Sequence, residues 1–216
     1  RPEKLIRCLD SIFKNTYKNL EVIVINGDAT KDIRLQLKKF KIKLIQPKKE
    51  IYFIEARNLG AKIAKGELLF FVDDDNILYN NAIENLVFKY MSLKNIGLLG
   101  PLMYTSSGDF WFYGGKATWI NPNVKPVPKY ELKKELIETD VIPNAYMISK
   151  KLYLKIGGED PNFLTHEELD LAQRLKIAGY KNYIYTKAVT IHNIGKRSMN
   201  LIDRPPYRMY ATVLSN

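Results

Sequence analysis

Apolar and polar positions follow two different periods in the first half of the chain. Apolar side chains recur every three or four positions in several segments, which predicts helices near residues 5–13, 30–40, 54–65 and 82–90. Between them, short runs of β-branched and other apolar residues predict strands near residues 21–25, 42–45, 68–72 and 96–103. Strands that alternate with helices of about ten residues favour an α/β fold with a mostly parallel sheet and right-handed crossovers.

The pattern changes after residue 104. Residues 104–130 hold both tryptophans and several glycines and prolines without a clean period, so we expect loops and short strands that shape a substrate pocket over one end of the sheet. Beyond them we expect a strand, two helices and one or two further strands, at residues 138–149, 150–156, 166–178 and 181–192. We assign residues 1–198 to a single domain, and residues 199–216 to a C-terminal tail or the start of an incomplete element.

The length and composition are those of one globular domain. The chain has 216 residues, of which 46% are hydrophobic and 26% are charged. Its single cysteine, Cys8, cannot form an internal disulfide, which suits a reducing compartment. We find no signal peptide and no run of about 20 apolar residues that would span a membrane. We therefore expect a cytoplasmic protein, either free or on the cytoplasmic face of a membrane.

Basic residues outnumber acidic ones, 34 against 23, and give a net charge of +11. This excess favours anionic partners such as phosphorylated ligands, nucleic acid or an anionic membrane surface; the alternative is a solvated lysine-rich surface. The lysines are spread along the chain, without the interleaved aromatic residues and motifs of nucleic-acid binders. We therefore expect no nucleic-acid partner, while peripheral contact with an anionic membrane stays open.

Three adjacent carboxylates end an unbroken apolar run, residues 68–72. Asp73, Asp74 and Asp75 repel one another, so a protein keeps them together only where water or a cation offsets that repulsion. Open α/β sheets place their ligands at the carboxyl ends of buried strands. A divalent cation that carries a diphosphate fits there. The alternative is an acidic turn that leads into the next helix.

Five segments, in this order, resemble glycosyltransferase family 2. They are residues 21–32, 56–60, 66–75, 157–160 and 167–171, followed by Arg174, Gly179, His192 and Ser198. The resemblance covers nearly the whole chain except the family's first strand, which we expect upstream of Arg1. It implies the GT-A fold, which is an α/β fold with a mixed, mostly parallel sheet flanked by helices, and an enzyme that inverts configuration at the transferred sugar.

The resemblance also implies residues that bind the donor. Asn26 stands where the family usually has an aspartate that contacts the nucleotide base; its carbonyl can still accept a hydrogen bond, but without the charge. Asp28 either replaces that contact or only forms a turn. Arg57 and Asn58 match the family's A-R-N segment beside the donor, where a guanidinium can reach a diphosphate. Alternatively, Asn58 and Gly60 only set helix packing.

The aspartates match the family's DXD-type metal motif, with Asp73 and Asp75 as its outer members. By resemblance, Asp75 binds Mg²⁺ or Mn²⁺, and Asp73 faces the ribose or sugar of the donor as well as the metal, with Asp74 between them. Oxygen ligands suit these hard cations. A bound cation would neutralise the charge that develops on a nucleoside diphosphate leaving group.

His192 ends an apolar strand at a position where related sequences carry a histidine. By resemblance it completes the metal shell or contacts the diphosphate, although a histidine at a strand end is often structural. Lys196 and Arg197 follow, and they would clamp phosphate oxygens of the donor.

Glu167 and Glu168 stand where the family usually has Glu-Asp, whose acidic group is the general base. We expect Glu168 to be the base, with Glu167 as the second candidate. The alternative is structural: Thr165 as N-cap and Glu168 at N3 form a capping box, and acidic residues suit the start of a helix.

These features predict a hexosyl- or deoxyhexosyltransferase that uses a UDP-, GDP- or dTDP-sugar and a hydroxyl acceptor on a glycan or glycolipid. Two alternatives remain at this point. A polyprenyl-phosphate sugar transferase would need no strong base, and the positive charge would draw it to an anionic membrane. A module with the same fold and no catalysis would explain why Asn26 and Glu168 depart from the family pattern.

Overall fold

The computed structural model describes residues 2–28, 32–117, 123–163, 167–193 and 209–215. Its helices are α1 (Pro2–Lys14), α2 (Arg34–Leu37), α3 (Phe53–Ile63), α4 (Ala82–Ser92), α5 (Lys150–Lys155) and α6 (Glu167–Ile177), with a 3-10 helix, η1 (Lys129–Lys133). Its strands are β1 (Leu20–Asn26), β2 (Lys43–Ile45), β3 (Leu68–Asp73), β4 (Asn76–Leu78), β5 (Ile96–Thr105), β6 (Phe110–Phe112), β7 (Gly115–Lys116), β8 (Lys125–Pro126), β9 (Leu136–Glu138), β10 (Ala145–Ser149), β11 (Lys181–His192) and β12 (Met209–Ser215).

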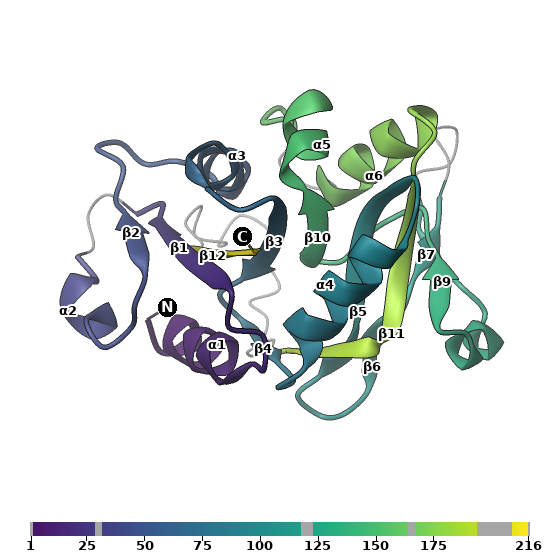
Figure 1. Ribbon diagram of the computed structural model, residues 1–216, viewed down its shortest axis with the longest axis horizontal. Coiled ribbons are helices and arrows are strands. Elements are labelled where there is room, and N and C mark those ends of the chain that lie inside the picture. Colours follow the sequence, from purple (N-terminus) through teal and green to yellow (C-terminus); the bar gives the residue numbers. More distant parts are fainter. Residues whose placement is uncertain (1, 29–31, 118–122, 164–166, 194–208, 216) are drawn as a thin grey trace.

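One mixed sheet forms the centre of the molecule (Figure 1). Its order is β2-β1-β12-β3-β10-β5-β11-β4, with β6 beside β5 and β9 beside β11, and β7 and β8 form a separate hairpin. Strands β2, β1, β3, β5 and β11 run in one direction, whereas β12 and β10 lie antiparallel between them. The expected α/β architecture, with a mixed sheet flanked by helices, is confirmed.

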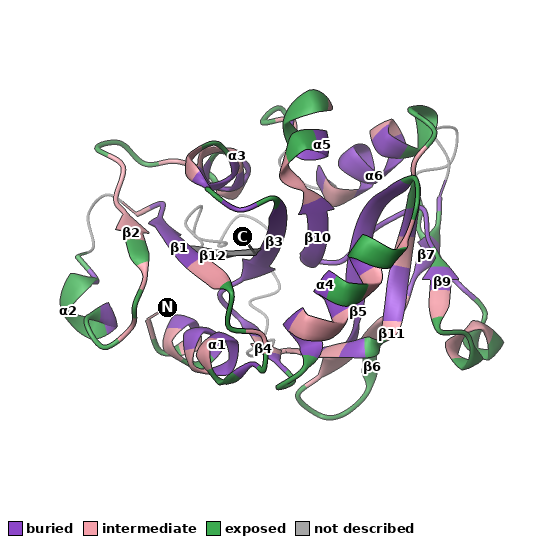
Figure 2. Cartoon of the chain, viewed as in Figure 1, coloured by how far each residue is buried: buried purple, intermediate pink, exposed green. Residues whose placement is uncertain are grey.

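The sheet separates two apolar cores. In β1, Val22 and Val24 join the core that includes α1, α2 and α4, whereas Ile23 and Ile25 join the core that includes α3, α5 and α6. Strand β3 divides its side chains in the same way, because successive residues of a strand point to opposite faces. This explains its unbroken apolar run: Figure 2 shows β3 buried along its length in the middle of the sheet.

Some elements differ from the sequence prediction, which for example contains no strand at β4. Residues 138–149 form two strands, β9 and β10, rather than one. The backbone N–H of Asp140 bonds to Gly115, and Pro143 has no N–H to donate, so the segment between the strands leaves the sheet although Val141 and Ile142 are buried. Of the helix expected over residues 30–40, the described residues 32–40 form only α2, in which Leu37 is the sole buried side chain.

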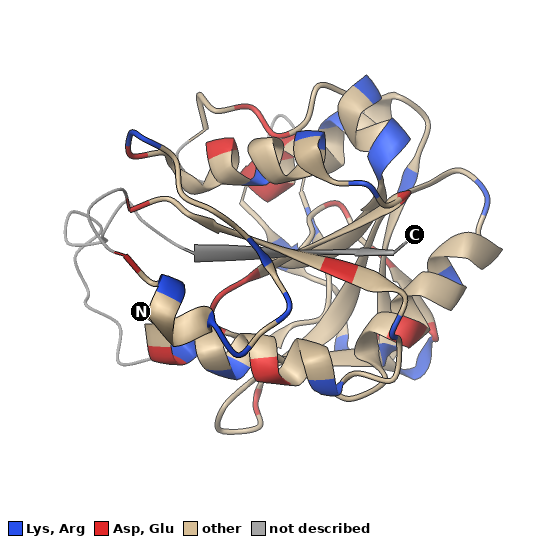
Figure 3. Cartoon of the chain, turned by 60° about the vertical axis from the view of Figure 1, so that its left-hand side comes forward, with Lys and Arg blue, Asp and Glu red and all other residues tan. Residues whose placement is uncertain are grey.

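The C-terminal part of the chain supplies one strand to the sheet. The sequence predicts a tail or the start of an incomplete element over residues 199–216. Within this range, β12 lies between β1 and β3. None of the helices in the described ranges has the length and apolar character needed to cross a membrane. Lys and Arg residues are spread over several helices and loops rather than gathered in one groove in the view of Figure 3.

Candidate active site

The carboxyl ends of the strands that share a direction meet at one edge of the sheet. Ile25 of β1 and Asp73 of β3 both lie opposite Tyr210 of β12, so these strands end at the same level. His192, the last residue of β11, pairs with Thr105 of β5 and with the first residue of β4. The turn between β3 and β4 therefore brings the three aspartates and His192 to one place.

The three aspartates are buried at the end of β3. Asp73 is the last residue of that strand, and Asp74 and Asp75 form the turn into β4. Burying ionised carboxylates costs free energy unless charges or hydrogen bonds offset the loss of water. The hydrogen-bond donors and charges that the surrounding elements supply therefore determine the chemistry of each carboxylate.

Asp75 and His192 form a pair that fits a divalent cation. Their Oδ1 and Nε2 atoms lie 3.3 Å apart, and the backbone N–H of Asn193 donates to the backbone oxygen of Asp75 at 2.7 Å. Two neighbouring ligands of an octahedral cation, each about 2.1 Å from it, lie about 3 Å apart. No three His, Cys, Asp or Glu side chains come together as a metal cage within the described ranges. A cation bound here would therefore take further ligands from a substrate phosphate or water, as Mg²⁺ commonly does.

His192 is held in place by two neighbours. Its Nε2 lies 3.4 Å from the amide nitrogen of Asn144, and the ring of Trp111 packs edge-to-face against the imidazole, with 5.0 Å between the ring centroids. Trp111 belongs to β6, within residues 104–130, the region expected to shape a substrate pocket. These contacts fix the direction in which the imidazole faces Asp75.

Asp73 is held by two donors. Arg57 Nη2 donates to Oδ1 at 2.9 Å, and the Asn144 amide donates to Oδ2 at 3.2 Å. Each carboxylate oxygen therefore accepts a hydrogen bond from the protein. This arrangement orients Asp73 beside the Asp75–His192 pair.

Arg57 lies at the centre of four carboxylates. Its side chain is 1% exposed, and Nη1 donates to Glu159 Oε1 at 2.8 Å while Nη2 donates to Asp73. Glu167 and Glu168 lie 3.7 Å and 3.6 Å from the same guanidinium. Burial lowers the pKa of Arg57, but the charges of Glu159 and Asp73 more than offset this, so the pKa lies well above its ordinary value.

Glu159 is a site residue that the sequence analysis did not select. It is fully buried, and Oε1 accepts hydrogen bonds from Arg57 and from the hydroxyl of Tyr146. Burial raises the pKa of its carboxyl, while the Arg57 charge opposes that rise. The sequence feature that could have identified Glu159 is its position directly after the Gly157-Gly158 pair, within one of the five family segments.

Two further carboxylates begin α6. Glu167 is buried, with 8% of its side chain exposed, and Glu168 is 18% exposed, so Glu168 is more accessible to a substrate. Burial and the neighbouring Glu167 charge raise the pKa of Glu168 to about 8, although the Arg57 charge opposes this rise. Burial also raises the pKa of Glu167. A carboxyl with such a pKa is suited to exchange a proton near neutral pH.

Comparison with known proteins places the chain in a family. Residues 1–157 match the family model described as glycosyl transferase family 2. This chain belongs to glycosyltransferase family 2. Glycosyltransferase GlyG of Streptococcus pneumoniae is 27% identical over 117 residues, which are 50% of this chain and 38% of GlyG. The Escherichia coli protein WfgD, a UDP-Glc:α-D-GlcNAc-diphosphoundecaprenol β-1,3-glucosyltransferase, is 32% identical over 90 residues, or 40% of this chain and 35% of WfgD.

A solved structure shows the same fold. The crystal structure of GalNAc-T7 with UDP, GalNAc and Mn²⁺ superposes with a TM-score of 0.76 at 18% identity, and the match covers 94% of this chain and 42% of GalNAc-T7. The likeness shows the GT-A fold that the sequence predicted. The chain spans less than half the length of each of these three proteins.

In this family 2 chain, Asn58 holds a turn. Its amide donates to the Glu159 backbone oxygen at 2.7 Å, and its carbonyl accepts from the Glu159 N–H at 3.1 Å and the Tyr153 hydroxyl at 2.7 Å. Gly158 has φ +72°, and a Cβ there would lie 2.3 Å from Asn58 Oδ1. These contacts support the packing alternative for Asn58, while its contact with a donor stays a prediction.

The remaining predicted donor residues lie at the same edge or outside the described ranges. Asn26 is buried at the end of β1, and its Oδ1 accepts the backbone N–H of Asp28 at 3.3 Å, which supports the turn role of this pair. Contact of either residue with a base stays a prediction. Lys196 and Arg197 lie outside the described residues, as does Thr165, the expected N-cap of α6.

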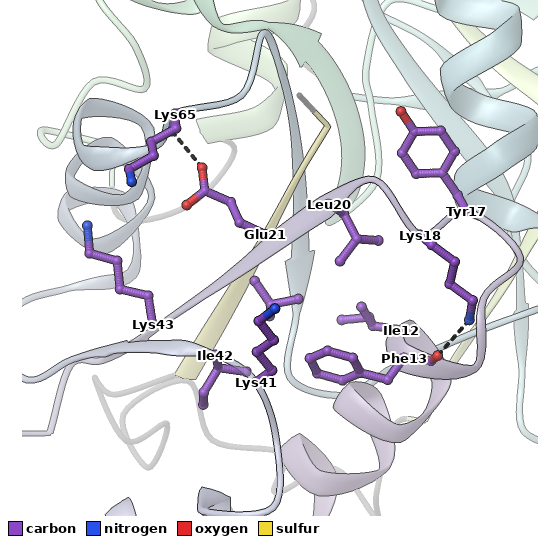
Figure 4. A pocket seen from close by; sticks show the side chains of 11 residues that line it. Ile12, Phe13, Tyr17, Lys18, Leu20, Glu21, Lys41, Ile42, Lys43 and Lys65 are labelled. Carbon is purple, nitrogen blue, oxygen red and sulfur yellow. Dashed lines mark hydrogen bonds between the residues drawn. The ribbon is translucent and has the colours of Figure 1, made fainter.

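A cavity of about 520 Å³ lies away from this site, at the starts of β1 and β2 (Figure 4). Apolar residues of α1, of β1 and of the segment before β2 line it together with four lysines, Lys18, Lys41, Lys43 and Lys65. Its one carboxylate, Glu21, accepts the backbone N–H of Lys65 at 2.6 Å. The cavity offers no acid–base pair, so the carboxyl edge of the sheet is the candidate active site.

The buried ion pairs of Arg57 are expected to stabilise the fold. Replacing Arg57 with methionine is expected to lower the free energy of unfolding by about 3–5 kcal/mol, because Asp73 and Glu159 would then be buried without their cation. Urea unfolding measures the change. The matched control is Arg34→Met, since Arg34 pairs with Asp32 on the exposed surface and its loss should change the free energy of unfolding little. Equal effects of the two variants would contradict the structural role of Arg57.

Proposed function

We propose that this chain transfers a hexosyl or deoxyhexosyl group, with inversion, from a nucleoside diphosphate sugar to a hydroxyl of a glycan or glycolipid. The observation that carries the proposal is the arrangement around Asp73. Asp75 follows it in the same turn and faces His192 at the end of β11, and Arg57 links Asp73 to Glu168. A possible metal pair and a candidate base therefore border one oriented carboxylate.

Asp75 and His192 would hold the Mg²⁺ or Mn²⁺. When bound, this cation would neutralise the charge that develops on the departing nucleoside diphosphate. Asp73, oriented by Arg57 and Asn144, has lone pairs left to accept hydrogen bonds from hydroxyls of the donor. These residues would bind the donor at this edge of the sheet.

Glu168 would take the proton of the acceptor hydroxyl. The acceptor oxygen forms a bond to the anomeric carbon as the bond from that carbon to the diphosphate breaks, and the proton passes to the Glu168 carboxylate. One displacement of this kind inverts the configuration. The greater exposure of Glu168 favours it over Glu167 for this role.

A second candidate is transfer to a polyprenyl phosphate. The net charge of +11 favours it, because a basic protein is attracted to an anionic membrane where such lipids reside. The lipid-linked acceptor in the name of WfgD supports a glycolipid acceptor for the first candidate as well. The two reactions differ in their need for Glu168, since a phosphate acceptor requires no strong base.

A thermal-shift panel tests donor binding. UDP, GDP, dTDP and CDP are each added with and without Mn²⁺, and the melting temperature is expected to rise with one nucleotide in a Mn²⁺-dependent way. A nucleotide at about 100 times its dissociation constant adds about 2.7 kcal/mol of stability. Asp75→Asn should remove the Mn²⁺-dependent part of the shift. The absence of a shift with all four nucleotides would favour a module without catalysis.

A further inference from the structure

One face of α1 lies along the acidic turn. Lys4, Cys8 and Ser11 are spaced four and three residues apart, so they lie on the same side of the helix. The Cys8 thiol donates to the Asp73 backbone oxygen at 3.6 Å, and Ser11 Oγ accepts the backbone N–H of Leu78 at 3.0 Å. Figure 1 shows α1 beside β4. These contacts fix where the first turn of α1 places Lys4.

Lys4 reaches the carboxylate of the proposed metal pair. Its Nζ lies 3.9 Å from Asp75 Oδ2 and donates to the backbone oxygen of Asn193 at 2.8 Å. Asn193 in turn donates its N–H to the Asp75 backbone oxygen. The side chain is only 24% exposed. The ammonium is therefore held between the end of β11 and the carboxylate, rather than extended into water.

The Lys4 ammonium lies close to the place that a divalent cation on Asp75 would occupy. A cation about 2.1 Å from an Asp75 oxygen would lie within a few Å of Lys4, and like charges at that separation repel. A diphosphate would offset this repulsion between Lys4 and the cation, because its oxygens attract both the ammonium and the metal. Arg57 cannot replace Lys4 in this respect, since its guanidinium is directed to Asp73 and Glu159.

We propose that Lys4 couples metal binding to donor binding: its ammonium competes with the divalent cation for Asp75, and transfers to the diphosphate when the donor enters. This inference rests on the proposed function. The consequence is cooperative binding, in which the metal binds weakly alone and tightly with a nucleoside diphosphate. Lys4 thereby limits unproductive metal binding and adds a cation to the leaving group.

Metal affinity provides the test. Binding of Mn²⁺ is measured by the loss of the electron paramagnetic resonance signal of the free ion, first alone and then with UDP and with GDP. Lys4→Met is expected to bind Mn²⁺ alone about tenfold more tightly, the size expected for one unit charge removed near a divalent ion. The tightening of Mn²⁺ binding by the nucleotide should shrink by about the same factor. Lys4→Arg keeps the charge and should behave as the unmodified protein.

The matched control is Lys14→Met, in the last turn of the same helix. It removes the same charge about 15 Å away along the axis and should leave Mn²⁺ affinity unchanged. Unchanged Mn²⁺ affinity in Lys4→Met, or an equal gain in Lys14→Met, would overturn the role of Lys4. Asp75→Asn tests the proposed function separately: if Mn²⁺ binds as tightly to that variant, the metal pair itself is wrong. No Mn²⁺ binding to any of the proteins would overturn both.

Discussion

Replacing Asp75 with alanine is expected to lower glycosyl transfer at least a thousandfold while leaving the fold intact. Asp75 supplies the oxygen of the proposed metal pair, and His192 alone would hold the cation poorly. Losing the cation removes the charge that stabilises the departing diphosphate, which is among the largest contributions to such a reaction. Release of nucleoside diphosphate from the donor found in the thermal-shift panel measures the rate.

The control for this variant is Asp10→Ala. Asp10 lies on α1 and pairs with Lys39 on the exposed surface, so its loss should change neither rate nor stability appreciably. Far-ultraviolet circular dichroism checks that both variants are folded. Near-normal transfer by Asp75→Ala with saturating Mn²⁺ would show that Asp75 is not needed as a metal ligand. Loss of transfer with unchanged Mn²⁺ affinity would give Asp75 a different role.

Strand β3 illustrates what the sequence predicted well. Its apolar run has no alternation because both faces are buried, and the pattern ends sharply where the polar edge begins. The helical periodicity of α1, α3 and α4 was equally readable, since each buries one face, whereas α6 is buried on most sides. The rule that ligands lie at carboxyl ends of strands placed the aspartates at this edge, and the resemblance to the family implied that His192 would join them.

The partners of Arg57 illustrate what the sequence could not show. Glu159 lies 102 residues away from Arg57, and several anions could have served as its partner, a donor diphosphate among them. Only the folded structure brings Arg57 of α3 to Asp73 at the end of β3 and to Glu159 in the turn after α5. The contact between Lys4 and Asp75 is hidden for the same reason, because it depends on how α1 lies along β4 rather than on any local pattern.

Replacing Glu168 with glutamine is expected to lower transfer to a hydroxyl acceptor about 100- to 10,000-fold, because the amide cannot take the proton of the acceptor. Donor binding should persist, since the proposed metal pair and Asp73 are unchanged, and the Mn²⁺-dependent thermal shift checks this. Glu167→Gln is the matched control, because Glu167 is adjacent, more buried and also near Arg57. A larger loss in Glu167→Gln than in Glu168→Gln would reverse the two assignments.

The pH dependence of transfer separates a base from a residue that only supports the fold. The pKa of Glu168 is raised to about 8, so below that pH most of its carboxyl is protonated and cannot accept a proton. The rate should therefore rise about tenfold per pH unit up to about pH 8 and level off above it. In Glu168→Gln the residual rate should lose this rise. If instead transfer to a polyprenyl phosphate keeps its rate in Glu168→Gln, the phosphate oxygen of that acceptor is already ionised and needs no base, which supports the second candidate function.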